Sequence, residues 1–357
     1  MRKYYIDNIR ILCILLLFPF HSAMIFNNFG ESWYIHSQNS IWASLFIVCV
    51  HPWWMSLLFV LSGMSTVYAL KRRSTKEYVK ERFLKLFVPL VSAILFLIPV
   101  QTYLADRFFY NYTGNYFEHL SIYFTLTDWS GYDGHFTPAH TWFLLYLFLI
   151  SIASLPLLIW YRNREKKIDG ASLTMGKILP MFLIILICTP ILAIGGKSIG
   201  EYASCFLLGY FVLSIEEVQD RLEKYRIPLG IIWIVFTAAG CVFYEVHSSG
   251  GLIWDMGQRI LGWIGILAIL GLGKHYLAHE HAFTRYFATA AFPIYLFHQT
   301  IVVIVGYLIV RHLHGALLQY VLIVGISFVL TIFMYEICRR IGVTRFLFGI
   351  KKRQVKA

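Results

Sequence analysis

Residues 10–28 read RILCILLLFPFHSAMIFNN, an apolar run with an arginine at its first position and a histidine near its middle. At about 1.5 Å per residue, a helix of this length nearly crosses the hydrocarbon core of a bilayer, which is about 30 Å thick. Ionisable side chains inside a membrane are costly and usually line a pathway or a site. The stretch therefore predicts a membrane span in which Arg10 and His21 carry a function.

The composition of the whole chain indicates many such spans. Of its 357 residues, 58% are hydrophobic and only 14% are charged, which is more apolar surface than a soluble core of this length can bury. Apolar runs of about 20 residues between charged loops predict an all-α, polytopic integral membrane bundle of about ten transmembrane helices. The expected spans are residues 9–28, 41–70, 84–104, 142–161, 178–194, 199–215, 227–246, 254–273, 285–310 and 317–339.

The distribution of charge predicts the topology. The net charge of +12 comes from Lys and Arg in short loops and not from one basic domain, so nucleic acid is not an expected partner. Because the basic residues crowd alternate loops, both termini are predicted to be cytoplasmic. The longest outer loop, residues 105–139, suits carbohydrate contact and interfacial anchoring about equally. We expect a multi-pass protein of the inner (plasma) membrane, with one transmembrane domain over residues 1–345 and a basic cytoplasmic tail over residues 346–357.

Several classes of site have no signature in the chain. The six cysteines lie inside apolar runs and never in a C-x-x-C spacing, which argues against a zinc site and a disulfide framework. No A-x-A cleavage pattern follows the first run, so that run is interpreted as a retained span and not as a signal peptide. The sequence also lacks a G-x-S-x-G elbow, a Walker loop and a dinucleotide fingerprint. We therefore expect no metal and no tightly bound cofactor.

The spacing of the two ionisable residues in the first span has a geometric meaning. Eleven steps of about 100° return to within about 20° of the starting direction, so Arg10 and His21 share one face of a straight helix. They would stand roughly 16 Å apart, with Arg10 at the cytoplasmic surface and His21 near mid-membrane. Pro19 can kink the helix and free a carbonyl beside His21. The alternatives are that Arg10 snorkels to the headgroups and that His21 bonds a neighbouring helix.

With this spacing, the sequence resembles the membrane-bound acyltransferase 3 family, bacterial enzymes that acylate glycans and other envelope or secreted molecules. Four further stretches carry the resemblance in the same order along the chain. They are WWMSLLFVLSGMSTVYALKRRS at 53–74, ERFLKLFVPL at 81–90, HTWFLLYL at 140–147 and FPIYLFHQTIVV at 292–303. Within the family, the chain is most similar to the branch that contains the periplasmic glucan succinyltransferase.

The resemblance implies a membrane O-acyltransferase with acyl-coenzyme A (acyl-CoA) as a cytoplasmic co-substrate. It would move an acetyl- or succinyl-type group to a hydroxyl of an extracytoplasmic or lipid-linked glycan, with membrane lipids as its other partner. His21 would act as general base on that hydroxyl, or as a transient acyl carrier. Arg10 would hold the phosphates of the donor or steer its chain.

The second loop is predicted to bind the phosphates of the donor, because Arg suits bidentate phosphate contact and Lys supplies a point charge. The alternative is ordinary contact with anionic lipid. The predicted donor-binding residues are Arg72, Arg73, Lys76, Arg82 and Lys85. The family often has an arginine where this chain has Lys85, so the charge is kept and the guanidinium fork is lost.

Three polar or aromatic residues at membrane depth are predicted to bind the acceptor: His140, Trp142 and His298. His298 lies beside Gln299, and a buried histidine there can instead complete a hydrogen bond between helices. Trp142 can instead be an interfacial anchor.

The rival from another class is a multi-span transporter or flippase of a glycan or a small envelope metabolite. It would share the basic inner loops, but internal repeats with helices broken at corresponding positions would be expected. The prolines Pro19, Pro52 and Pro293 show no such symmetry.

Overall fold

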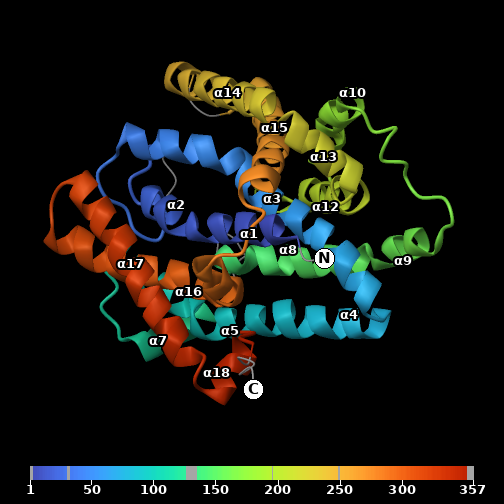
Figure 1. The fold of residues 1–357 in the computed structure, drawn as a ribbon. Coiled ribbons are helices and arrows are strands. Elements are labelled where there is room, and N and C mark those ends of the chain that lie inside the picture. Colours follow the sequence, from blue (N-terminus) through green and yellow to red (C-terminus); the bar gives the residue numbers. More distant parts are fainter. Residues whose placement is uncertain (1–2, 30–32, 126–134, 195, 248–249, 352–357) are drawn as a thin grey trace. The chain divides into compact units, whose positions relative to one another are not determined.

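The computed structural model describes residues 3–29, 33–125, 135–194, 196–247 and 250–351 (Figure 1). The chain divides into two compact units, each described by itself below. The first unit comprises residues 1–13, 48–81 and 146–284, and the second comprises residues 14–47, 82–145 and 285–357. The chain passes between the units within α1, α3, α8 and α16 and at the end of α4.

The described elements are mostly helices. They are α1 (Tyr4–Leu15), α2 (Leu17–Met24), α3 (Ile41–Arg72), α4 (Thr75–Arg82), η1 (Phe83–Phe87), α5 (Val88–Phe96), α6 (Ile98–Phe109), α7 (Tyr116–Tyr123), η2 (Ala139–Thr141), α8 (Trp142–Ala153), α9 (Leu155–Asn163), α10 (Met175–Ile178), η3 (Leu179–Met181), α11 (Phe182–Cys188), β1 (Ala193–Ile194), β2 (Lys197–Ser198), α12 (Ile199–Leu208), η4 (Gly209–Leu213), α13 (Glu216–Lys224), α14 (Arg226–His247), α15 (Leu252–Tyr276), α16 (Ala282–His312), α17 (Ala316–Cys338) and α18 (Gly342–Leu347). β1 and β2 form one antiparallel pair, with Ala193 opposite Ser198.

Among the described residues, seven helices are long and apolar enough to cross a membrane, and up to nine spans result if each of two bent helix pairs counts as one. The bent pairs are Ala139–Ala153 with Leu155–Asn163, at 44°, and Ile199–Leu213 with Glu216–Lys224, at 95°. The remaining predicted span, residues 178–194, corresponds to the shorter apolar helix Met175–Cys188. An all-α, polytopic membrane fold is confirmed. The total of ten spans and the side of each terminus stay predictions.

The first predicted span, counted above as one candidate span over Tyr4–Met24, is interrupted at one residue. α1 ends at Leu15 and α2 begins at Leu17. Pro19 has no N–H to donate, so the carbonyl four residues earlier, that of Leu15, loses its helical donor. The prediction that a carbonyl is freed beside His21 is therefore wrong, because the affected carbonyl lies about one and a half turns before it. The interruption lies between Arg10 and His21, and these two residues belong to different units. The prediction that they share one helix face therefore stays a prediction.

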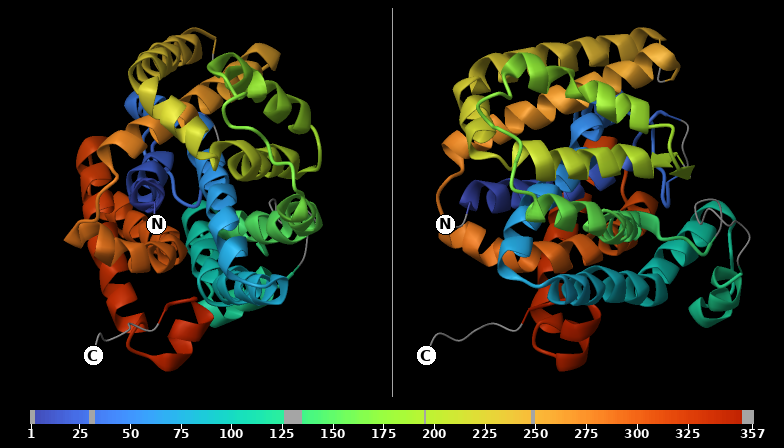
Figure 2. Two further views of the ribbon diagram at one scale, coloured as in Figure 1. Left: turned by 45° about the vertical axis from the view of Figure 1, so that its right-hand side comes forward. Right: turned by 90° about the vertical axis from the view of Figure 1, so that its right-hand side faces the viewer.

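Glycines bring elements of the first unit into backbone contact. A Cβ on Gly63 of α3 would lie 2.0 Å from the carbonyl oxygen of Phe206, and one on Gly209 of η4 would lie 2.3 Å from that of Val60. No side chain fits at such distances, so only glycine allows this approach of α3 to α12 and η4. In the same unit, the consecutive helices α14 and α15 pack side by side (Figure 2). α3 and η4 both line the cavity described below.

A buried polar network fixes the position of α16 in the second unit. Gln299 Nε2 donates to Gln101 Oε1 of α6 over 3.0 Å, and Gln101 Nε2 donates to Thr300 Oγ1 over 2.7 Å. Thr300 Oγ1 in turn donates to the carbonyl of Leu97 over 3.2 Å. Because a buried amide without partners is costly, these bonds favour one register between α6 and α16. His298 is the residue just before this network.

The predicted basic tail over residues 346–357 begins inside α18, and its residues 352–357 lie outside the described residues.

Candidate active site

Three histidines from three different segments lie together in the second unit. His21 is on α2, His140 is in η2 and His298 is on α16. The ring centroids of His21 and His298 are 5.1 Å apart, and those of His140 and His298 are 5.3 Å apart. His298 is fully buried, His140 is 6% exposed and His21 is partly buried. We call these three residues the histidine cluster; each was predicted from the sequence as a site residue.

Backbone carbonyls orient two of the three imidazoles. His140 Nε2 donates to the carbonyl of Leu296 over 2.9 Å, and His298 Nδ1 donates to the carbonyl of Tyr295 over 2.6 Å. Because a carbonyl can only accept, these nitrogens carry the hydrogen in the neutral rings, and the other nitrogen of each ring has a lone pair. His140 Nδ1 and His298 Nε2 are buried and have no hydrogen-bond partner among the described residues. The cluster thus holds two buried acceptors.

A second contact ties η2 to α16. The hydroxyl of Tyr295 donates to the carbonyl of His140 over 2.7 Å, so the two segments are joined by reciprocal bonds. Ala139, just before His140, has φ of 45°, a left-handed conformation that costs a residue with a Cβ about 1–2 kcal/mol. Trp142, the third predicted acceptor-binding residue, is the first residue of α8 and is partly buried. The chain therefore adopts a strained turn that holds His140 against α16.

Aromatic side chains surround the histidine cluster. The ring of Trp33 stacks on His21 with a centroid distance of 5.7 Å and an interplanar angle of 14°. Phe18 meets His298 edge-on at 6.0 Å. Tyr34 contacts Trp33, and burial raises the pKa of its phenol, which keeps the hydroxyl neutral. No sequence pattern marks Trp33, because it lies beyond the end of the first span in a segment without helical periodicity.

Arg10 lies in the first unit, on α1. Its Nη1 forms an ion pair with Asp7 Oδ1 at 3.0 Å, and its Nη2 donates to Ser65 Oγ of α3 over 2.7 Å. Ser65 Oγ donates to the carbonyl of Leu61 over 2.7 Å. About a third of the Arg10 side chain, 33%, is exposed. The guanidinium is therefore held against α3 and still reaches solvent.

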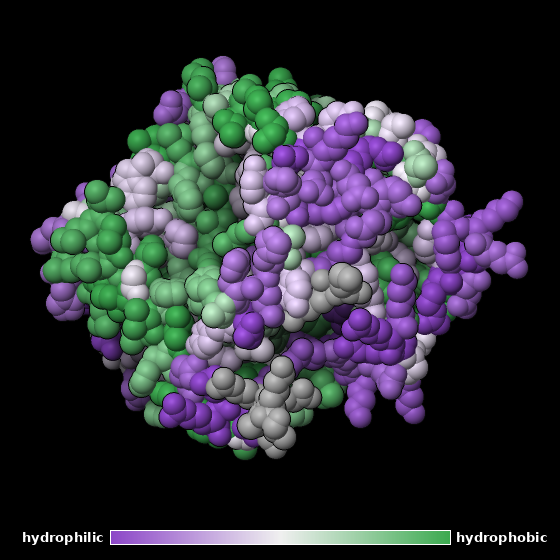
Figure 3. Space-filling model, viewed as in Figure 1, coloured by the Kyte–Doolittle hydropathy of each residue, from purple (hydrophilic) through white to green (hydrophobic). Residues whose placement is uncertain are grey.

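The first unit contains a cavity of about 860 Å³ with a basic lining. Aromatic residues, mostly tyrosines, and other residues of α3 and η4 form much of its wall. The cationic residues of the described lining are Lys3, Lys71, Arg162, Lys167 and Lys274, and Glu216 is its carboxylate. The tyrosines of the lining are Tyr4, Tyr5, Tyr68, Tyr161 and Tyr210. We call this space the basic cavity. Hydrophilic side chains gather over α13, which supplies Glu216 (Figure 3).

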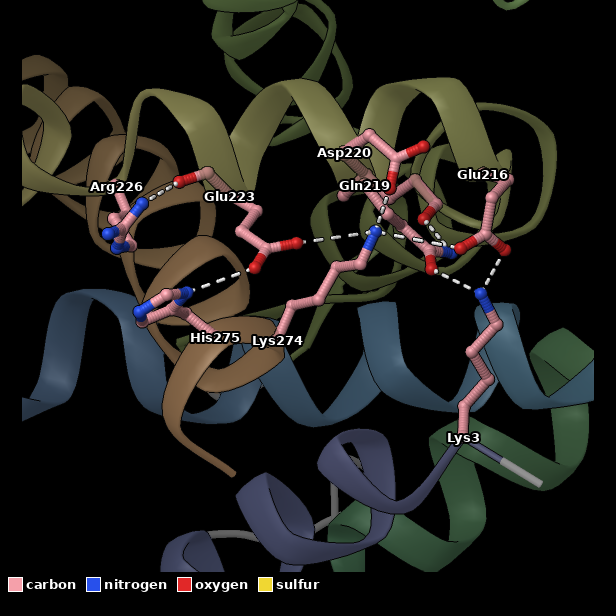
Figure 4. Close-up of polar contacts among 9 residues, drawn as sticks. Lys3, Glu216, Gln219, Asp220, Glu223, Arg226, Lys274 and His275 are labelled. Atoms are coloured by element: carbon pink, nitrogen blue, oxygen red, sulfur yellow. Dashed lines mark hydrogen bonds and ion pairs between the residues drawn. The ribbon is translucent and has the colours of Figure 1, made fainter. Parts of the chain in front are cut away.

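The acidic face of α13 holds two of the five cations of the cavity (Figure 4). Lys3 pairs with Glu216. Lys274 pairs with Asp220 and lies 3.5 Å from Glu216 and 3.6 Å from Glu223. These carboxylates offset the charge of Lys3 and Lys274, so their ammonium groups attract an anion in the cavity less strongly.

Lys71, Arg162 and Lys167 supply the rest of the positive charge of the cavity. Arg162 Nη1 donates to the carbonyl of Leu70 over 3.3 Å, and Lys167 Nζ lies 4.9 Å from the ring centroid of Tyr161. A guanidinium and two ammonium groups beside phenol rings suit a ligand with phosphates and a flat ring system.

The predicted donor-binding residues lie in two places. Lys71, next to them in sequence, lines the basic cavity. Three of the predicted residues are exposed in the first unit and are not among the described lining residues: Arg72, Arg73 and Lys76. Arg82 and Lys85 are partly buried and belong to the second unit. The cavity thus joins Lys71 to cations from distant segments that no local pattern connects to it.

Among the described residues, one group could hold a metal ion. It consists of Asp106, His119 and His135, whose ligand atoms lie within 4.8 Å of one another. All three come from the loop over residues 105–139, which was predicted to contact carbohydrate or the membrane interface. The expectation of no metal rested on the cysteines and on the absence of a zinc-ligand spacing, and these three residues are too far apart in sequence to form such a spacing.

The chain belongs to the acyltransferase 3 family, because the model of that family, described as an acyltransferase domain, matches residues 3–336. The protein is therefore a membrane acyltransferase, transferring groups other than aminoacyl groups. The resemblance carried by the quoted stretches is confirmed. The family match supports the enzyme interpretation and gives no support to the rival transporter interpretation.

Three relatives that match over nearly the whole chain share one name. The chain is 25% identical over 389 residues to the glucans biosynthesis protein C of Salmonella typhimurium, covering 100% of this chain and 97% of the relative. It is 24% identical over 380 residues to the proteins of the same name from Salmonella heidelberg and Salmonella typhi, covering 98% of this chain and 95% of each relative. No solved structure matches the chain.

Proposed function

We propose that this protein transfers an acetyl- or succinyl-type group from cytoplasmic acyl-CoA to a hydroxyl of an extracytoplasmic or lipid-linked glycan, with His21 as general base. The observation that carries the proposal is the meeting of His21, His140 and His298 in one cluster. The name of the Salmonella relatives supports a glucan-type acceptor. The inner membrane is the compartment that such a reaction requires.

The histidine cluster suits the acceptor half of the reaction. A neutral His21 takes the proton of the acceptor hydroxyl as its oxygen attacks the thioester carbonyl, and the tetrahedral intermediate collapses with loss of the CoA thiolate. The imidazolium then returns the proton to the thiolate. His298 Nε2 and His140 Nδ1, both acceptors without a partner among the described residues, can receive hydrogen bonds from the acceptor or from protonated His21. Trp33 and Trp142 offer flat apolar faces on which a sugar ring can stack.

The basic cavity suits the donor half. CoA carries a pyrophosphate and a 3′-phosphate on an adenosine, and Lys71, Arg162 and Lys167 supply cations beside tyrosine rings. The exposed basic residues that follow Lys71 would draw the anionic donor toward the cavity: Arg72, Arg73 and Lys76. We keep Arg10 as a residue that steers the donor, because its guanidinium is partly exposed. Arg82 and Lys85 remain proposed phosphate contacts on their charge alone.

Two experiments test the halves separately. Mass spectrometry of envelope glycans from cells with and without the intact gene should show an acyl mass that disappears on deletion and returns with the wild-type gene. Unchanged glycan masses would contradict the proposed acceptor class. For the donor, purified protein should gain thermal stability with acetyl- or succinyl-CoA. The absence of any rise in Tm with either donor at millimolar concentration would contradict acyl-CoA as the co-substrate.

A further inference from the structure

A tight turn after α6 brings Asp106 and His119 together in the second unit. Asn111 has φ of 51°, a left-handed conformation that asparagine tolerates better than most residues. Asn115 then caps α7: its side chain accepts from the backbone N–H of Glu118 over 3.0 Å, and the Glu118 carboxylate accepts from the N–H of Asn115 over 2.9 Å. α7 therefore starts at a defined residue and packs back on α6, which places His119 against Asp106.

Two imidazoles from different segments point the same nitrogen at one carboxylate oxygen. His119 Nε2 lies 2.8 Å from Asp106 Oδ2, and His135 Nε2 lies 2.7 Å from the same oxygen. The side chain of His119 is fully buried, that of Asp106 is 13% exposed and that of His135 is 33% exposed. The group is therefore built into the unit on the side of His119 and open to solvent on the side of His135.

We propose that Asp106, His119 and His135 form a zinc site. Imidazole nitrogen and carboxylate oxygen are zinc ligands, and three protein ligands with one open position for water are a known zinc arrangement. Ligand atoms around a tetrahedral zinc ion stand about 3.4 Å apart, so each gap from Nε2 to Oδ2 must open by roughly 0.6–0.7 Å to admit the ion. A set with two nitrogen ligands does not suit calcium or magnesium, which prefer oxygen.

The site would tie the outer loop to the histidine cluster. The ion would join α6, α7 and the segment that contains His135, and His140 follows His135 by five residues along the same segment. Zinc bound only by the folded loop stabilises that loop. The ion would hold the approach to η2, and it has no part in the proton transfer proposed for His21.

Metal content tests the proposal on the full chain, purified through a tag without histidines so that the tag binds no zinc. The protein is incubated with zinc sulfate, dialysed against metal-free buffer and measured by elemental analysis. The wild type should retain roughly one zinc ion per chain. Asp106→Asn and His135→Ala should bind zinc at least about tenfold to a hundredfold more weakly, because each loses a ligand. His314→Ala, which removes an exposed histidine of the same unit, should retain zinc like the wild type.

Two further readouts guard against loss of folding and against binding elsewhere. Both site variants should elute and melt as folded protein, since Asp106→Asn keeps the shape of the side chain and His135 is partly exposed. Zinc, but not calcium or magnesium, should raise the Tm of the wild type and of His314→Ala and leave that of Asp106→Asn unchanged. Equal zinc content in wild type and Asp106→Asn would overturn the proposal, as would a wild type that retains none. Acyl transfer is not part of either readout, so these results do not depend on the proposed function.

Discussion

The histidine cluster and the basic cavity hold their ionisable groups in opposite ways. In the cluster, His140 and His298 are bonded to backbone carbonyls, which fix the ring tautomer and add no formal charge. In the cavity, Lys3 and Lys274 are paired with the carboxylates of α13. One region is a set of imidazole rings, two of them buried, and the other is a partly balanced set of charged side chains.

This difference separates two tasks. A proton acceptor needs a lone pair, and the carbonyl bonds of His140 and His298 leave a lone pair on the other nitrogen of each neutral ring beside His21. A polyanionic donor must be attracted and released, which suits the exposed cations Lys71, Arg162 and Lys167 beside two cations that carboxylates offset, Lys3 and Lys274. We therefore expect changes in the cluster to lower kcat and changes in the cavity to raise the KM for the donor. Each of the following variants tests this separation of kcat from the KM for the donor.

His21→Ala should produce the largest effect. Loss of a general base lowers turnover by about 10²–10⁴-fold, and the KM for acyl-CoA should change little because the cavity is intact. The measurement is steady-state acyl transfer by purified protein. His314→Ala is the matched control, since it removes an exposed histidine of the same unit. Near-normal turnover in folded His21→Ala would contradict the assignment of His21 as the base. If this variant also lost its thermal stabilisation by acyl-CoA, the histidine cluster and the basic cavity would not act independently.

His298→Gln should reduce turnover by about 10–100-fold. The buried Nε2 of His298 has a lone pair beside His21, and a hydrogen bond to a charged group contributes about 1.5–3 kcal/mol. Glutamine keeps much of the volume and the polarity but cannot relay a proton. The kcat and KM for donor and acceptor should be measured separately. A rise in the KM for acceptor with unchanged kcat would assign His298 to acceptor binding alone, as the sequence predicted.

Most of the fold could be predicted from the sequence, because each span is a local property of an apolar run. A kink in the first span was predicted at Pro19, two residues before His21. Proline removes the hydrogen bond to the carbonyl four residues before it, which for Pro19 is that of Leu15. The helix is accordingly interrupted after Leu15 and not beside His21. The predicted span over residues 178–194 is shorter in the structure, since its helix ends at Cys188 before the β1–β2 hairpin.

The candidate site could be predicted residue by residue but not as an arrangement. His21, His140 and His298 were each predicted as site residues from their polar side chains in or beside apolar runs. Their proximity depends on packing between segments more than 100 residues apart in sequence. The hydrogen bond from His140 to Leu296, for example, joins residues 156 positions apart. Trp33 has no local signal at all. Asp106, His119 and His135 escaped notice because their spacing fits no short metal motif.

The double variant Lys71→Ala, Arg162→Ala should raise the KM for acyl-CoA by about tenfold and leave kcat nearly unchanged. Exposed cations contribute a few-fold each to the binding of a phosphate, and salt screens the effect. Lys80→Ala on α4 is the control, because Lys80 is exposed but is not among the described lining residues. Increasing ionic strength should shrink the difference between wild type and double variant. A fall in kcat of similar size would mean that these cations act on the reacting groups.

Tyr295→Phe should have the smallest effect, a loss of about fivefold in kcat. The variant removes the hydrogen bond of 2.7 Å from the Tyr295 hydroxyl to the carbonyl of His140, and a neutral hydrogen bond of this kind contributes about 1 kcal/mol. The ring and its packing against His140 remain, so Tm should fall only slightly. Because the bond positions His140 without touching the reactants, the KM for acyl-CoA should stay unchanged while kcat falls. A change in donor KM would contradict the separation of cluster and cavity more directly than any loss of rate, since Tyr295 lies in the second unit and the basic cavity in the first.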